Sequence, residues 1–135
     1  MNPHQKYRRN SSYGWTRIDM LLHIYNHTIN SLQNGADLLR SGSSVDELIL
    51  ARLDAQKKIL LITDGLAVDQ GGTAVQVMRL CVYALDQIQT DSVEAWESAA
   101  QVLSTVREGF EGIQGAARAA EQAGEIPALD HHTVE

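Results

Sequence analysis

The sequence predicts an all-α protein, an antiparallel up-down four-helix bundle with a short N-terminal arm. First, 135 residues that are 44% apolar and 21% charged suffice for a single hydrophobic core. Second, after residue 16 apolar residues recur every three or four positions, which is the period of a helix and not of a strand. Third, only short links separate the periodic segments, as in antiparallel bundles. We therefore expect an arm over 1–15, the bundle over 16–121 and a flexible tail over 122–135.

The first helix is expected to begin at Thr16. Its hydroxyl can cap the first free amides, and Asp19, three residues later, faces back toward the positive end of the helix. The helix should end near Ser41 and Gly42. The apolar stripe alternates steps of four and three and consists of Ile18, Leu22, Tyr25, Ile29, Leu32, Ala36 and Leu39.

The second helix is expected to begin at the capping box Ser44-Val45-Asp46-Glu47, where Ser44 and Glu47 can satisfy each other's backbone amide. Its main stripe is Leu48, Ala51, Ala55, Ile59, Ile62 and Leu66. A second face carries Ile49, Leu53 and Leu60, and a third carries Leu50, Leu61 and Val68. A helix that is apolar nearly all round is either buried on several sides or binds a partner.

The third helix follows a break at Asp69-Gln70-Gly71-Gly72. Its predicted core stripe is Ala74, Val77, Met78, Cys81, Ala84, Leu85 and Ile88, while Val75 and Val82 lie apart from it. The last helix is expected to open at Asp91, with Glu94 three residues later, and to be the longest. Its predicted stripe is Trp96, Ala99, Leu103, Val106, Phe110, Ile113 and Ala117. If Phe110 is buried, truncating it to Ala should cost about 3 to 5 kcal/mol.

The distribution of charge argues against nucleic-acid binding. Residues 1–17 carry four basic and no acidic side chains, whereas the remaining residues carry 7 basic and 17 acidic ones. A protein that follows phosphates needs a basic face, and an acidic body does not provide one.

The apolar runs predict neither a membrane span nor a secretory signal. The longest aliphatic run, Ile59 to Ile62, is far below the roughly 20 residues that cross a bilayer. The basic residues of the arm are followed by the polar segment Ser11–Gly14, where a signal peptide needs an apolar stretch. The single cysteine, Cys81, fits a reducing compartment. We therefore expect a cytoplasmic protein.

Residues suited to chemistry are few, and we expect no enzyme, cofactor or resident metal. No Glu lies three residues before a His, so the di-metal motif of helical bundles is missing from the sequence. Asp19, His23 and His27 share a helix face at a spacing that zinc can use, but a solvated polar face is the favoured interpretation. Gly71-Gly72 is interpreted as a turn and Cys81 as a packed thiol.

Three stretches resemble the FliS family of flagellin-specific export chaperones. They are Tyr7 with Thr16 and Met20-Leu21-Leu22-His23-Ile24-Tyr25-Asn26-His27; Ala55–Ile59 with Leu66–Gly72; and Val106-Arg107-Glu108-Gly109-Phe110. In order and spacing they cover about residues 7 to 115. The chain departs from the family at Thr16-Arg17, at Asn26-His27 and at Val82-Tyr83-Ala84.

The resemblance implies a cytosolic chaperone that binds the C-terminal segment of flagellin, prevents premature polymerisation and delivers it to the flagellar export apparatus. The predicted contact residues are Ile49, Leu53 and Leu60 on the second helix and Val75, Arg79 and Val82 on the third. The resemblance also implies an arm that covers part of the partner site, for which Tyr7, Tyr13 and Trp15 are the candidates. Two alternatives stay open: a metal-binding bundle that uses Asp19, His23 and His27, and a self-associating module that forms a homodimer through the extra face of the second helix.

Overall fold

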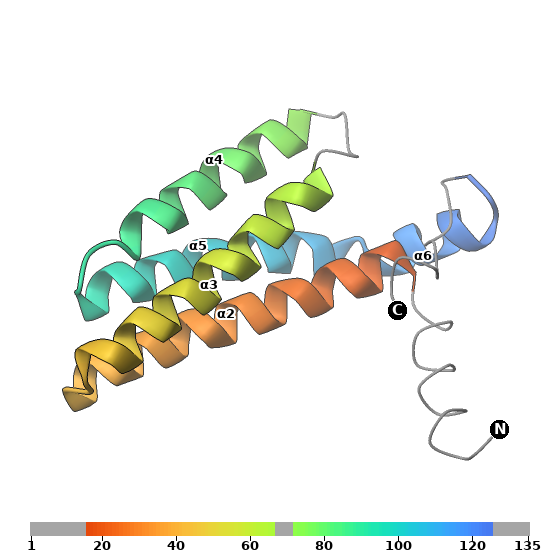
Figure 1. The fold of residues 1–135 in the computed structure, drawn as a ribbon. Coiled ribbons are helices and arrows are strands. Elements are labelled where there is room, and N and C mark those ends of the chain that lie inside the picture. The colour runs from red at the N-terminus through yellow and green to blue at the C-terminus, as the bar shows by residue number, and fades with distance from the viewer. Residues whose placement is uncertain (1–15, 67–71, 126–135) are drawn as a thin grey trace, which may run out of the picture.

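The computed structural model describes residues 16–66 and 72–125, and within these ranges it is helical with no strand. The helices are α2 (Arg17–Ser41), α3 (Val45–Leu66), α4 (Gly72–Gln87), α5 (Val93–Gly112) and α6 (Gln114–Gln122) (Figure 1). The all-α prediction is confirmed. The proposed arm with Tyr7, Tyr13 and Trp15, the break at 69–71 and most of the proposed tail lie outside the described residues. None of the described helices is long and apolar enough to cross a bilayer.

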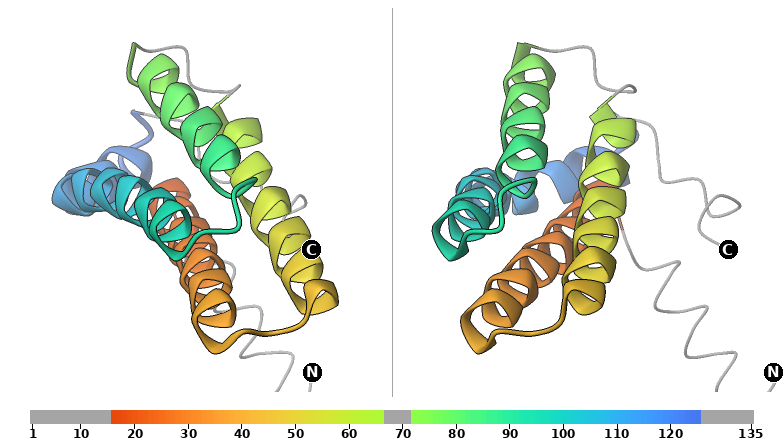
Figure 2. Two further views of the ribbon diagram at one scale, coloured as in Figure 1. Left: turned by 90° about the vertical axis from the view of Figure 1, so that its left-hand side faces the viewer. Right: turned by 60° about the vertical axis from the view of Figure 1, so that its left-hand side comes forward.

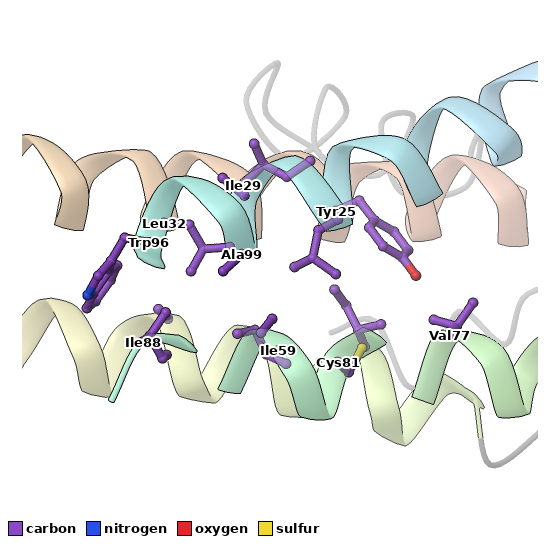
Figure 3. Close-up of a cluster of buried hydrophobic side chains, with 14 of the residues drawn as sticks. Tyr25, Ile29, Leu32, Ile59, Val77, Cys81, Ile88, Trp96 and Ala99 are labelled. Carbon is purple, nitrogen blue, oxygen red and sulfur yellow. The ribbon is translucent and has the colours of Figure 1, made fainter. Parts of the chain in front are cut away.

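The four long helices form two layers around one core. Helix α2 packs against α3 and α5, and α4 packs against the same two helices (Figure 2). In Figure 3 the core side chains lie between the α2/α5 pair and the α3/α4 pair. Each long helix therefore has two neighbours within its chain and one side turned outward.

The predicted apolar stripes supply this core. The largest fully buried apolar and aromatic side chains are Trp96, Tyr25, Leu32, Ile59, Ile62, Ile88 and Leu103 (Figure 3). All seven belong to the stripes read from the sequence, because residues three and four apart share one helix face. The ring of Tyr25 lies 5.7 Å from that of Phe110, centroid to centroid.

Local capping sets the ends of α2 and the start of α3. The amide of Thr16 donates to the carboxylate of Asp19 at 3.0 Å, and the amide of Asp19 donates back to the Thr16 hydroxyl, so the predicted capping box is present. Gly42 has φ 70°, and the amides of Gly42 and Ser43 close the helix on Leu39 and Leu38. This is the glycine-ended cap in which a left-handed residue stops the helix. At α3, the amide of Glu47 donates to the Ser44 hydroxyl at 3.2 Å.

The predicted opening of the last helix at Asp91 is wrong by one residue. Ser92 is the cap of α5, and its side chain accepts the amide of Ala95. Asp91 instead pairs with Arg52 of α3, whose Nε also donates to the carbonyl of Ile88 at 2.7 Å. Asp91, which the sequence pattern assigned to the cap of α5, thus forms a tertiary ion pair between α3 and the α4–α5 turn.

The prediction of one continuous last helix is also wrong. The helix breaks at Ile113 (φ −108°, ψ 5°), so that α5 ends at Gly112 and the short α6 follows. Gly112 and Gly115 flank the break, and glycine is a weak helix former. Ile113 is half exposed and does not belong to the core. The longest helix is therefore α2.

Two further predictions at the edges of the core need correction. Met78 was assigned to the core stripe of the third helix, but it is 39% exposed. Phe110 packs against the core but is only partly buried, so the burial on which the cost of 3 to 5 kcal/mol depended is incomplete. Both residues lie at the margin of a stripe, where the position of the neighbouring helix decides burial.

One contact that positions α2 against α5 had no counterpart in the sequence prediction. The ring of Trp96 packs directly on the backbone of α2 at Gly35, where a Cβ atom would overlap ring atoms Cζ3 and Cε3. Gly35 is buried in the middle of α2. Here the glycine provides the space that an indole ring needs to approach a helix backbone.

Candidate functional site

The most unusual feature of the surface is the amount of apolar side chain on α3 and α4. Among the described residues eleven large hydrophobic side chains are exposed, and ten of them lie on these two helices. They are Val45, Ile49, Leu50, Leu53, Leu60 and Leu61 on α3 and Val75, Met78, Val82 and Tyr83 on α4. Single exposed hydrophobic residues are normal on proteins, but gathered ones mark interaction sites.

The predicted contact residues of α3 lie on the outer side of that helix, away from its buried stripe. Arg52, which precedes Leu53, reaches the carbonyl of Ile88 at the end of α4. The opposite flank of α3 faces α2, where Asp54 accepts a hydrogen bond from Ser31 at 2.8 Å. At about 100° per residue, Ile49 and Leu60 lie closer to Arg52 than to Asp54 around the helix, and Leu53 lies midway between the two.

The predicted contact residues of α4 also lie away from the buried stripe of their helix, and not on the flank that contacts α5. On that flank of α4, the Tyr83 hydroxyl is hydrogen-bonded to that of Ser98 on α5 at 2.7 Å. Val75 and Val82 are turned away from that contact by about 80 to 100° around the helix axis. Helices α3 and α4 are neighbours and both carry exposed apolar side chains, and we call Ile49, Leu53, Leu60, Val75 and Val82 together the α3/α4 apolar face.

The side chains of this face are between 45% and 57% exposed. Arg79 is exposed on the same side of α4, four residues after Val75 and three before Val82. All six residues that the sequence analysis named as partner contacts are thus at the surface, and five of them form one face. Their role in binding stays a prediction. Met78 borders the face. The only indication of this in the sequence is that Met78 lies beside Val75 and Val82 on the helical wheel.

Asp19, one of the three candidate metal ligands, is occupied by structural contacts. Arg118 Nε and Gln114 Nε2 of α6 donate to its Oδ1 at 2.8 and 2.9 Å, while Thr16 donates to Oδ2. Burial alone would raise the pKa of Asp19, but the hydrogen bonds from Arg118, Thr16 and Gln114 outweigh it and hold this pKa far below the usual value. Asp19 therefore fastens α6 to the start of α2.

His23 and His27 are exposed, with ring centroids 4.3 Å apart. Partial burial and the neighbouring His27 lower the pKa of His23. In the ranges that the structure describes, no three His, Cys, Asp or Glu side chains come together in a way that could hold a metal ion. His23 instead lines a shallow pocket of about 430 Å³ together with Asp19, Leu22, Asn26, Glu111 and Gln114.

The outer side of the α2/α5 pair carries a polar pocket and no comparable apolar face. This pocket measures about 410 Å³ and is lined by Gln33, Ala36, Asp37, Arg40, Glu97, Ala100, Gln101 and Ser104. Arg40 lies at its edge, paired with Asp37 at 2.8 Å and also with Glu97. Its charged groups are thus already satisfied within the chain.

Cys81 is a buried thiol of the core, as predicted (Figure 3). Burial raises its pKa to about 11, so the thiol stays protonated near neutral pH. Burial likewise raises the pKa of Tyr25, which is fully enclosed. These two groups pack in the core.

Comparisons of the chain with protein-family models, with curated proteins and with solved structures found no match. The likeness to the FliS family therefore rests on the sequence stretches quoted above.

Proposed function

We propose that this protein is a non-enzymatic cytosolic chaperone of the FliS type, which binds the C-terminal segment of flagellin, prevents its premature polymerisation and delivers it to the flagellar export apparatus. The observation that carries the proposal is the α3/α4 apolar face. The core already has a complete stripe from each long helix, so this face is surplus to folding. Its five residues, together with Arg79, are the contacts predicted from the resemblance and the helical pattern.

We further propose that the four long helices form an antiparallel up-down bundle to which α6 is an appendix. Three links of a few residues, at 42–44, 67–71 and 88–92, favour antiparallel neighbours. The pairwise contacts of α2, α3, α4 and α5, each with two neighbours, agree with this arrangement. Such a bundle keeps one side of each helix free for a partner.

Binding would follow the physics of coupled folding. A disordered segment that docks as short helices places apolar anchors, three or four residues apart, on a complementary apolar surface. Ordering the segment costs about 2 to 5 kcal/mol of the gross interaction energy, which keeps the complex releasable. A chaperone that must hand its partner to an export machine needs such moderate affinity.

The test is a calorimetric titration of the purified chain with the C-terminal segment of flagellin from the same organism. Leu53→Asp and Val82→Asp each place one negative charge on the α3/α4 apolar face and should weaken binding at least tenfold. Gln101→Asp adds the same charge at the polar pocket and should bind like the unmodified chain. Circular dichroism of each variant checks that helicity is kept.

The outcomes separate clearly. A complex that Leu53→Asp and Val82→Asp weaken, and Gln101→Asp does not, supports the proposal. If the flagellin segment does not bind the unmodified chain, or binds all four proteins equally, the proposed function is wrong. Polymerisation of intact flagellin gives a second readout, since an equimolar amount of the chain should suppress it.

A further inference from the structure

A stripe of four exposed side chains runs along α4 with a pattern of charge that is complementary to itself. Val75, Arg79, Val82 and Asp86 follow one another at steps of four, three and four residues, so they share one side of the helix. All four are exposed. Two small apolar residues thus alternate with one cation and one anion.

Neither charge of this stripe is neutralised within the described chain. The structure shows no ion pair and no side-chain hydrogen bond of Arg79 or Asp86 with any described residue. The two residues are seven positions apart, which is about 10 Å along the helix and too far for a direct bond between them. Other cations at helix contacts, such as Arg40, Arg52 and Arg118, are paired.

A two-fold axis would satisfy both charges at once. Consider two copies of α4 that lie antiparallel about an axis between residues 82 and 83. Residue 79 of the first copy then lies opposite residue 86 of the second, and residue 86 of the first lies opposite residue 79 of the second. Two-fold interfaces of this kind are self-complementary, because each residue meets its counterpart twice. Val82 would then pack near the axis, with the apolar flank of α3 beside it.

We propose that the α3/α4 apolar face is also the contact between two copies of this chain, with Arg79 of each copy paired to Asp86 of the other. The dimer covers Val82 and brings the flanks that carry Leu53 and Leu60 to the edge of the interface. It requires no flagellin. Under the function proposed above, the free protein would hide its apolar face by self-association, and a partner chain would have to compete with the second copy.

The test is sedimentation equilibrium of the full chain over a wide concentration range, with four variants. Arg79→Asp and Asp86→Arg each turn both symmetric pairs into like-charge pairs, and each should raise the dimer dissociation constant roughly tenfold, more than a single exposed ion pair is worth. The charge swap Arg79→Asp with Asp86→Arg restores both pairs in reversed orientation and should return the dissociation constant to within about threefold of the original. Glu108→Arg on α5 makes the same change in net charge as Asp86→Arg and should leave it unchanged.

The decisive result is that both single reversals weaken the dimer and the charge swap recovers it. The two reversals change the net charge in opposite directions, so net charge cannot explain both losses, and the swap would not reverse a general loss of stability. The proposal is overturned if the chain is monomeric at every concentration. It is equally overturned if it dimerises but the single reversals leave the dissociation constant unchanged, or if the swap fails to recover it. The flagellin titration tests the proposed function independently, so the dimer and the flagellin complex can each be refuted without the other.

Discussion

The two layers of the molecule treat their outer surfaces in opposite ways. Helices α2 and α5 bury their apolar stripes and turn polar side chains outward, including the ion pair of Arg40 with Asp37 at the edge of a polar pocket. Helices α3 and α4 also contribute buried stripes to the core, yet they keep ten large apolar side chains at the surface. The outer surface of the α2/α5 layer is therefore mainly polar, whereas that of the α3/α4 layer is largely apolar.

This difference shows that burying the core does not account for all of the apolar sequence. Each exposed Leu or Val on α3 and α4 leaves apolar area in water that would contribute about 25 cal/mol per Å² if it were covered. The residues that α3 buries are the separate stripe of Ala51, Ala55, Ile59, Ile62 and Leu66. Covering by a second chain is the simplest use for what remains.

The strongest expected effect lies between the layers, at Trp96. Trp96→Ala removes the largest fully buried side chain and leaves a cavity beside Gly35, so the free energy of unfolding should fall by about 3 to 5 kcal/mol. Urea denaturation followed by circular dichroism measures this loss. A loss below 1 kcal/mol would mean that α5 is not anchored to α2 through the indole ring.

Gly35 gives the next largest effect and has a matched control. Gly35→Ala puts a methyl group into the ring of Trp96 and should destabilise the fold by about 1 to 3 kcal/mol, although alanine is the better helix former. Gly65→Ala, in α3, meets nothing within 4 Å and should be neutral or stabilising. Thermal melts of the two variants compare them directly, and equal melting temperatures would refute the close approach of α2 and α5.

The attachment of α6 should depend on pH through Asp19. Because the folded state lowers the pKa of Asp19, its ionised form stabilises the fold above the ordinary value of 3.8, and this contribution is lost as the pH falls below that value. Asp19→Asn should therefore lower the melting temperature at pH 7, by an amount on the order of 1 kcal/mol in stability. The difference from the unmodified chain should shrink as the pH falls below 3.8. If the difference in melting temperature between the two proteins does not change with pH, the charge of Asp19 does not stabilise the fold.

The smallest effect on stability is expected on the α3/α4 apolar face. Leu53→Ala and Val82→Ala should change the free energy of unfolding by no more than about 0.5 kcal/mol, since both side chains are more than half exposed. The same variants should reduce the fluorescence of a dye that binds apolar surfaces. Losses as large as that of Trp96→Ala would show that these residues belong to the core.

Local patterns were enough to predict most of the fold. The capping pair Thr16 and Asp19 and the buried position of Tyr25 follow from the spacing of residues within one helix, which the sequence displays directly. The exposed flank of α3 was predictable for the same reason, because a helix can bury only part of its circumference.

The features that the sequence could not reveal all depend on contacts between distant segments. Asp91 is not the cap of α5, and it pairs instead with Arg52 of another helix. The break at Ile113 accompanies the docking of Arg118 on Asp19, nearly a hundred residues apart in sequence. The close approach of Gly35 to Trp96 likewise requires knowing which helices are neighbours, and a glycine within a helical pattern looks only like a weak position.

The central claim is that the α3/α4 layer, and not the α2/α5 layer, receives the partner chain. The most direct measurement is carbene footprinting of the unmodified protein, free and in complex with the flagellin C-terminal segment, at concentrations where the free chain is monomeric. We predict that the complex protects Leu53, Leu60 and Val82 from labelling and leaves Gln33 and Gln101 as reactive as before. Protection at Gln33 and Gln101 with unchanged labelling of Leu53 and Val82 would contradict the account.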